Sequence, residues 1–199
     1  MIITDPDLLQ VEQRLAEQRF DPGPVDGVRT RETTVALWGL QKLNGLRPTG
    51  RLTKATLRAL ERPREVRPLV KKGARNRVEV DLERQLMVVY TDGRPALISH
   101  VSTGANRTYC VRGRCGDAVT PVGAFRVYHR VGGWQNGWLG AMYKPIYFNN
   151  GIALHGSTKV PRRPASHGCV RVPLHTADRL FRLVKMDFPV YVDRSSTSG

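Results

Sequence analysis

The reactive side chains of this chain gather in one stretch, Leu154-His-Gly-Ser-Thr-Lys-Val-Pro-Arg-Arg-Pro-Ala-Ser-His-Gly-Cys-Val-Arg-Val172. It holds two of the five histidines, His155 and His167, and one of the three cysteines, Cys169. Because Gly168 has no side chain, we expect a tight turn that presents the thiol beside backbone N–H groups. A thiolate, a base and N–H donors for an oxyanion are what acyl transfer by cysteine requires. The stretch therefore predicts cysteine-dependent acyl transfer.

The same stretch resembles a known family signature. His155-Gly156 followed by Ser166-His-Gly-Cys-Val-Arg171 resembles the motif of the L,D-transpeptidases (the YkuD domain), which cross-link bacterial peptidoglycan through an acyl-enzyme on cysteine. The resemblance implies that Cys169 is the nucleophile, that His155 is the proton donor and acceptor, and that His167 and Gly168 lie beside the oxyanion site. It implies no cofactor.

Four more residues are candidates for substrate binding. Gly156 and Ser166 belong to the signature, and Arg171 either holds a substrate carboxylate or braces the turn. Tyr143 lies in an aromatic-rich segment upstream of the motif and either walls a substrate groove or packs in the core. Only ten residues separate His155 from Ser166, fewer than in many relatives, so we expect a differently shaped loop over the site.

Cys169 could also have one of two roles outside acyl transfer. His155, His167 and Cys169 could supply three zinc ligands, but neither Cys110 nor Cys115 stands at an obvious spacing for a fourth ligand. An inert buried cysteine is disfavoured by the polar residues on both sides of Cys169. The remaining histidines, His100, His129 and His175, are expected to be structural or exposed.

The first third of the chain has helical periodicity. We expect helices from Asp5-Pro6 to about Phe20, from Thr33 to Leu43, and from Leu52 or Thr53 to about Leu60. The segment also contains a short repeat, in which a threonine follows a glycine after six residues. The two copies are Gly27 with Thr33 and Gly50 with Thr56. Residues 5–62 resemble the three-helix peptidoglycan-binding domain found beside many wall enzymes.

A proline-rich segment at 63–74 is the expected linker, because its prolines and alternating charges disfavour regular structure. Strand alternation follows, with a hairpin turn at Asp92-Gly93. The segment 173–184 predicts an amphipathic helix, and 194–199 a polar tail. The predicted fold is thus multidomain α and β: a small three-helix bundle, then a mostly β, sandwich-like catalytic domain over 75–193 with one helix. We expect two modules that act independently, so that loss of 1–62 would spare the chemistry on small substrates.

The amino-acid composition limits which binding partners are expected. The formal net charge is +15, from 32 Lys plus Arg against 17 Asp plus Glu, but the basic residues are scattered and no nucleic-acid motif accompanies them. A polyanionic cell wall would attract the same charge. No apolar run is long enough to span a membrane, and the first residues lack the features of a signal peptide. We therefore expect a monomer that binds peptidoglycan stem peptides and glycan, with no nucleic acid and no membrane span.

The number of cysteines indicates the cellular compartment in which the protein works. In an exported protein an even pair tends to oxidise, so a disulfide between Cys110 and Cys115 would leave Cys169 as the free thiol. We expect an extracytoplasmic, cell-wall location, although no export signal is visible. The predicted function is L,D-transpeptidation. Two alternatives stay open: an L,D-carboxypeptidase acting on the same substrate, and a non-catalytic wall-binding protein.

Overall fold

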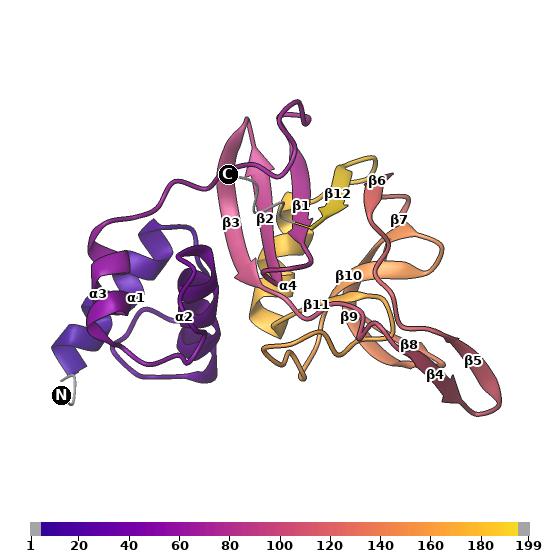
Figure 1. Cartoon of the computed structure of the whole chain (residues 1–199), viewed down its shortest axis with the longest axis horizontal. Coiled ribbons are helices and arrows are strands. Elements are labelled where there is room, and N and C mark those ends of the chain that lie inside the picture. The colour runs from indigo at the N-terminus through magenta and orange to yellow at the C-terminus, as the bar shows by residue number, and fades with distance from the viewer. Residues whose placement is uncertain (1–4, 195–199) are drawn as a thin grey trace.

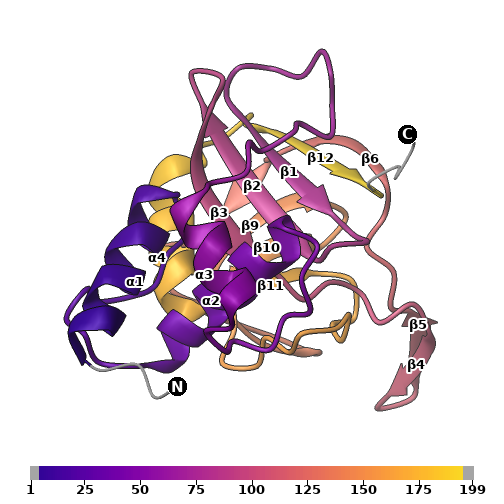
Figure 2. The ribbon, with the colours of Figure 1, turned by 60° about the vertical axis from the view of Figure 1, so that its left-hand side comes forward.

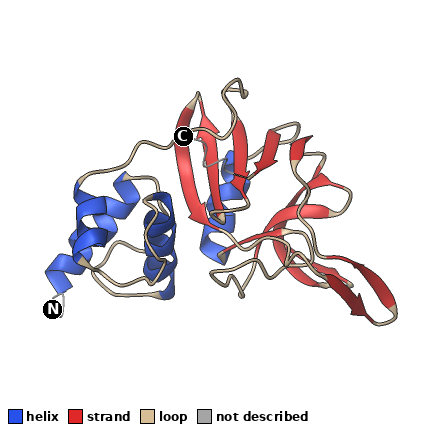
Figure 3. Cartoon of the chain, viewed as in Figure 1, coloured by secondary structure: helices blue, strands red, loops and turns tan. Residues whose placement is uncertain are grey.

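The computed structural model describes residues 5–194, so most of the expected tail lies outside the described residues. Three helices, α1 (Asp5–Glu17), α2 (Arg31–Leu43) and α3 (Lys54–Glu61), form one end of the molecule (Figure 1). The strands form the opposite end, together with α4 (Leu174–Leu183) (Figure 3). This is the fold class that the sequence predicts. No helix within residues 5–194 is long and apolar enough to cross a membrane.

The strands form two sheets and a separate hairpin. The first sheet has the order β3-β2-β1-β12-β6. It consists of β1 (Arg77–Asp81), β2 (Leu86–Thr91), β3 (Arg94–His100), β6 (Gly123–Arg126) and β12 (Pro189–Asp193). The second sheet has the order β11-β10-β9-β7, with β8 paired to β9. It consists of β7 (His129–Arg130), β8 (Trp134–Gly137), β9 (Gly140–Asn149), β10 (Ile152–Gly156) and β11 (Val170–Val172). The hairpin of β4 (Thr108–Val111) and β5 (Arg114–Asp117) extends away from both sheets (Figure 1).

Both sheets and α4 enclose one apolar core. Met87 and Val89 of the first sheet, Leu154 and Val170 of the second, and Leu180 of α4 all belong to it and are almost completely buried. Because alternate residues of a strand point to opposite faces, the neighbours of Leu154 and Val170 must point away from this core. That second face is where the motif residues lie.

The glycine and threonine repeat of the helical domain has a structural cause. Glu12 is completely buried and accepts hydrogen bonds from the N–H of Gly27 (2.9 Å) and from Thr33 Oγ1 (3.0 Å). Gln41 has the same role in the second copy, where it accepts from the N–H of Gly50 (2.9 Å) and donates to Thr56 Oγ1 (3.1 Å). Each copy thus ties a glycine turn to the start of the following helix through one buried polar side chain.

The first helix ends earlier than the sequence suggests. Periodicity predicts an end near Phe20, but α1 ends at Glu17 and Arg19 has a left-handed φ of 70°. Phe20 leaves the helix to form a bridge with Ile98 of β3 and is 1% exposed. The turn at Arg19 therefore docks the helical domain onto the first sheet.

This docking argues against the expectation of two independent modules. Leu86, Val88 and Tyr90 of β2 point away from the core between the sheets and join the apolar cluster of the helical domain, together with Ile98. Figure 1 shows α2 lying directly beside β3, with α1 and α3 on the far side of α2, and Figure 2 shows the same end of the molecule from another side. The first sheet is therefore covered on both faces, and its outer cover is the helical domain.

Candidate active site

Cys169 lies directly before β11 and is the free cysteine of the described residues. Its Sγ accepts a hydrogen bond from the N–H of Ala153 (3.5 Å) and lies 3.9 Å from the carbonyl oxygen of Gly151. Burial raises the pKa of the thiol, while the Ala153 N–H and the charge of Arg171 act in the opposite direction. The resting thiol is thus protonated at neutral pH, and it needs a base to become a nucleophile.

His155 lies on β10, the strand to whose backbone Cys169 bonds. The parallel strands β10 and β11 pair Leu154 with Val170 and His155 with Arg171. Because Leu154 and Val170 fill the core, His155 and Arg171 project from the opposite face. Cys169 Sγ bonds to the backbone N–H of Ala153, which lies two residues before His155 on β10. Arg171 connects the two, because its charge acts on both the imidazole of His155 and the thiol of Cys169.

The hydrogen bonding of His155 defines its basic atom. Nδ1 lies 2.9 Å from the carbonyl oxygen of Gly156, which can only accept, so Nδ1 carries the hydrogen and Nε2 keeps its lone pair. His155 is 5% exposed. Burial lowers its pKa to about 4, opposed by the Gly156 bond and assisted by the charge of Arg171. At neutral pH the ring is therefore a neutral base.

The turn between Ser166 and Cys169 is locked by side-chain bonds. Ser166 Oγ accepts from the N–H of Gly168 (3.0 Å) and donates to the carbonyl oxygen of Cys169. Gly168 has a φ of 142°, and a Cβ there would lie 3.1 Å from the carbonyl oxygen of Val119. Since the N–H of Gly168 is already bonded, Gly168 contributes conformation to the site and Ser166 contributes rigidity.

Thr120 is a site residue that was not among the candidates from the sequence. Its buried Oγ1 donates to the carbonyl oxygen of Gly168 (2.6 Å) and accepts from the N–H of Gly104 (2.9 Å). A Cβ at Gly104 would lie only 2.5 Å from the carbonyl oxygen of Ala118, so the two loops approach each other closely. The Thr-Pro-Val-Gly-Ala-Phe segment that begins at Thr120 is the sequence signal that could have found it.

His167 and Arg171 border the turn. The ring of His167 meets Tyr109 of β4 edge to face, with 4.6 Å between centroids, and burial lowers the pKa of His167. Arg171 Nη1 donates to the carbonyl oxygen of Ala165 (3.4 Å). Of the two roles expected for Arg171, this contact favours bracing the turn.

Tyr143 and Gly156 pack against α4. Tyr143 Oη donates to Asp178 Oδ1 of that helix (2.9 Å). A Cβ at Gly156 would lie 2.8 Å from the Cβ of Ala177 and 3.0 Å from the Tyr143 ring, so both residues pack toward the helix. Within residues 5–194 neither residue makes a hydrogen bond to Cys169, and their contact with substrate stays a prediction.

A different tyrosine lies beside the cysteine. Tyr147 pairs with Ala153, whose N–H bonds to Cys169 Sγ. Its pKa is raised by burial and then by the charge that Cys169 carries as a thiolate. Tyr147 Oη donates to Gln135 Oε1 (2.7 Å), and its ring stacks on His129. The sequence could not favour Tyr147 over Tyr143 because the two stand on the same strand, four residues apart.

The zinc alternative is not supported by the positions of the side chains. Within residues 5–194, no group of three or more His, Cys, Asp or Glu side chains is placed to hold a metal ion. His155, His167 and Cys169 accordingly do not converge on a common point.

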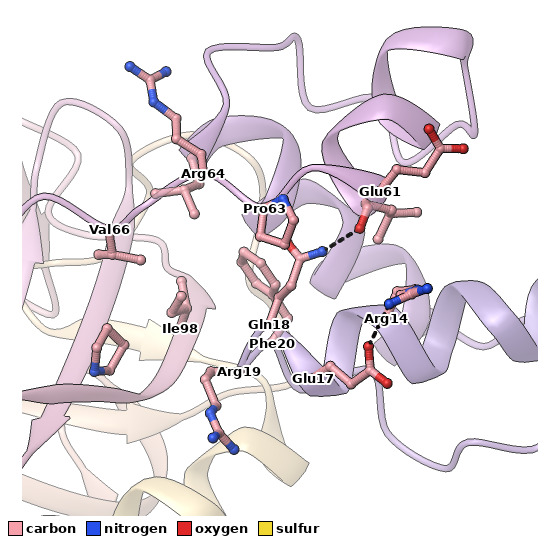
Figure 4. A pocket seen from close by; sticks show the side chains of 13 residues that line it. Arg14, Glu17, Gln18, Arg19, Phe20, Glu61, Pro63, Arg64, Val66 and Ile98 are labelled. Atoms are coloured by element: carbon pink, nitrogen blue, oxygen red, sulfur yellow. Dashed lines mark hydrogen bonds and ion pairs between the residues drawn. The ribbon is translucent and has the colours of Figure 1, made fainter.

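One cavity lies away from these residues. It has a volume of about 360 Å³ and opens between the end of α1, the segment after α3 and strand β3 (Figure 4). Three arginines and two glutamates line it together with apolar residues: Arg14, Arg19, Arg64, Glu17, Glu61, Phe20, Val66 and Ile98. It is a groove of the domain junction and contains no residue of the 154–172 stretch.

Comparison with known proteins identifies both domains. The family model of the L,D-transpeptidase catalytic domain (YkuD) matches residues 75–192, and that of a putative peptidoglycan binding domain matches residues 4–60. No curated protein matches the chain.

Solved structures give the same result. An L,D-transpeptidase of Xylanimonas cellulosilytica is 34% identical, covers 94% of this chain and 93% of its own, and superposes with a TM-score of 0.87. One of Stackebrandtia nassauensis is 26% identical over 96% of this chain and 93% of its own, with a TM-score of 0.51. A mutant L,D-transpeptidase of Enterococcus faecium is 25% identical over 60% of this chain and 50% of its own, with a TM-score of 0.50. With a catalytic-domain match over more than half of its length and a close structural relative over both domains, this chain belongs to the L,D-transpeptidase (YkuD) family.

Proposed function

We propose that this protein is an L,D-transpeptidase that forms peptidoglycan cross-links through an acyl-enzyme on Cys169. One observation carries the proposal. The free thiol of Cys169 bonds to the N–H of Ala153, two residues before His155 on β10, and the charge of Arg171 acts on both side chains. The lone pair of His155 Nε2 makes no hydrogen bond within residues 5–194. A protonated thiol beside a neutral base is the resting state that general-base activation requires.

In the acylation step, Cys169 Sγ attacks the carbonyl carbon of the third stem residue, typically a diamino acid, while His155 Nε2 takes the thiol proton. The oxygen of the tetrahedral intermediate is stabilised by backbone N–H groups of the turn. Since the N–H of Gly168 is bonded to Ser166, the N–H of Cys169 itself is the proposed donor. The intermediate then collapses, the C–N bond to the terminal D-alanine breaks, and D-alanine leaves with the proton from His155.

In the second step, an amine of a neighbouring stem attacks the thioester carbonyl. His155 Nε2 takes the proton of that amine and returns it to the departing sulfur, which restores the thiol as the new amide forms. Water in place of the amine would give the carboxypeptidase reaction with the same residues.

The test is the intact mass of the protein after incubation with a muropeptide tetrapeptide. We expect one adduct per chain with the mass of the stem lacking D-alanine, lost in the Cys169→Ala variant. Product analysis with and without an added acceptor amine then separates cross-linking from hydrolysis. Wild-type protein that binds the peptide without any adduct would leave only the non-catalytic alternative.

The helical domain is proposed to hold the enzyme on the wall, as its family description suggests for its relatives. Sedimentation with purified sacculi at moderate salt, which screens bare charge attraction, measures this. An extracytoplasmic location is supported by the Cys110–Cys115 disulfide, because such bonds persist in oxidising compartments.

A further inference from the structure

Lys42 of α2 is a partly buried lysine that the proposed chemistry does not use. Its Nζ lies 2.9 Å from His100 Nδ1, 3.4 Å from the carbonyl oxygen of Gln85 and 3.3 Å from that of Arg162. These three acceptors come from three different segments of the catalytic domain. A lysine ammonium has three N–H donors, so one charged group can satisfy all three acceptors at once.

One connection runs from Lys42 to the nucleophile turn through Gln85. The side chain of Gln85 donates to Thr103 Oγ1 (2.6 Å) and accepts from the N–H of Thr103 (2.9 Å). The carbonyl oxygen of Thr103 in turn accepts from the N–H groups of Ala165 and Ser166, both at 2.9 Å. Ser166 then bonds to the backbone of the turn that carries the nucleophile.

A second connection runs through the loop that precedes this turn. Lys42 Nζ donates to the carbonyl oxygen of Arg162. In the opposite direction, Arg162 Nη1 donates to the carbonyl oxygen of Pro48 in the helical domain (3.0 Å). His100 Nε2 donates to the carbonyl oxygen of Pro161 (3.0 Å) and Ser102 Oγ to that of Arg163 (2.8 Å). The loop is thus clamped between the two domains.

We propose that Lys42 is a positioning residue of the peptidoglycan-binding domain, which fixes the 161–166 loop and thereby the Ser166 to Cys169 turn, so that the helical domain sets the reactivity of the catalytic domain. The inference rests on the proposed role of Cys169. It adds to wall binding a second task for the helical domain, carried out within the same chain.

The charge of Lys42 makes this role measurable. The pKa of Lys42 is lowered to about 7, mainly by burial, with Asp81 acting against this shift and Arg162 acting with it. His100, the titratable group in direct contact, is neutral over the working range because burial lowers its pKa to about 3. Above about pH 7 the neutral amine keeps two N–H donors for three acceptors, so the hold on the loop weakens.

The first test compares two adjacent arginines in the full-length chain. Arg162→Ala removes the bond to Pro48, whereas Arg163→Ala removes a side chain of the same kind that makes no hydrogen bond or ion pair within residues 5–194. We expect Arg162→Ala to lower kcat/KM for tetrapeptide turnover by about threefold, within the range of coupling through packed networks, and Arg163→Ala to leave it unchanged. Equal values for the two variants would overturn the proposal.

The second test uses Lys42→Met, which keeps the length of the side chain and removes its donors. We expect a loss of about tenfold in kcat/KM at pH 6, and a ratio of wild type to variant that shrinks as pH rises through about 7. A purely structural role would give a ratio that does not change with pH, and that result would contradict the proposal. Thermal unfolding of each variant establishes that the assays are run on folded protein.

The rate at which iodoacetamide alkylates Cys169 provides a readout that needs no enzymatic turnover. We expect this rate to change in Lys42→Met and in Arg162→Ala but not in Arg163→Ala. If wild type is inactive on stem peptides, the proposed function fails while the alkylation comparison still tests the coupling. If wild type is active and Lys42→Met matches it at every pH, only the coupling fails.

Discussion

His155 and His100 are two buried histidines with almost the same environment and opposite uses. They are 5% and 1% exposed, and burial lowers their pKa values to about 4 and about 3. Each ring donates from one nitrogen to a backbone carbonyl. The difference lies in the second nitrogen: that of His100 accepts from Lys42, whereas that of His155 makes no hydrogen bond within the described part of the chain.

The comparison shows that burial alone does not mark a catalytic histidine. Both rings are neutral at pH 7, so both could serve as a base if a proton were within reach. In His100 the lone pair is already used to join two domains. In His155 it is left open, on the strand whose Ala153 N–H bonds to Cys169. Substitutions at these and neighbouring positions test this difference, from the largest expected effect to the smallest.

Removal of the thiol should have the greatest effect. Cys169→Ala should abolish release of D-alanine while leaving the fold intact, and Cys169→Ser should be nearly inactive because a hydroxyl is much harder to deprotonate beside imidazole. Turnover of the tetrapeptide and thermal unfolding measure the two parts. A normal rate in the alanine variant would make the nucleophile assignment wrong.

Substituting the two histidines should separate rate from stability. His155→Ala should lower the acylation rate by roughly two to four orders of magnitude, the usual contribution of a general base.

His100→Ala should lower the free energy of unfolding by about 2 to 4 kcal/mol, since it leaves a cavity and an unpaired carbonyl, and it should reduce the rate less than His155→Ala does. His167→Ala should reduce the rate less than His155→Ala. If His167→Ala were the slower enzyme, the two roles would have to be exchanged.

Deletion of residues 1–62 tests the junction that His100 helps to form. The deletion uncovers the outer face of β2 and β3, and each large apolar side chain exposed there costs about 1.5 to 3 kcal/mol. We therefore expect a lower unfolding temperature and reduced activity even on soluble tetrapeptide, as well as weaker binding to sacculi. Unchanged turnover by a folded truncated chain would restore the view of independent modules.

The free energy of unfolding should depend on pH through both His155 and His100. Their folded pKa values lie below the unfolded value of about 6.5, so the stability that their neutral forms contribute is complete above pH 6.5 and is lost as pH falls through about 4 and 3. Urea unfolding of wild type should show this fall, and His100→Ala should show a shallower one. Parallel curves for the two proteins would contradict the assigned pKa of His100.

The smallest effect is expected at the Cys110–Cys115 hairpin. This bond joins cysteines five positions apart and contributes only about 2 kcal/mol by chain-entropy arguments, mostly to the local hairpin. Alkylation of the oxidised protein should label Cys169 alone, and labelling after reduction and unfolding should reach all three cysteines. Three reactive thiols before reduction would remove the disulfide and the argument for compartment built on it.

Some features of the fold follow from short segments. The Asp92-Gly93 dipeptide predicts the β2 to β3 turn, and both residues have positive φ as such a turn requires. The apolar run at 86–90 carries more information than a strand signal alone. A strand that is apolar at every position is covered on both faces, which here means by the core and by the helical domain. This run is therefore the sequence feature that argues against independent modules.

By itself, the sequence determined the fold class, the helical and β domains, and the stretch that carries Cys169, His155 and His167, because periodicity, turn residues and a family motif are local properties of the chain. Only the tertiary structure decided which distant polar groups come into contact. It places Thr120 against Gly168, Tyr147 rather than Tyr143 beside the thiol, and Lys42 against the loop before the turn. The contacts of Lys42 with Gln85 and Arg162 join residues 43 and 120 positions apart. Such contacts depend on how sheets and helices pack, and packing is settled by the burial of whole faces rather than by any short segment.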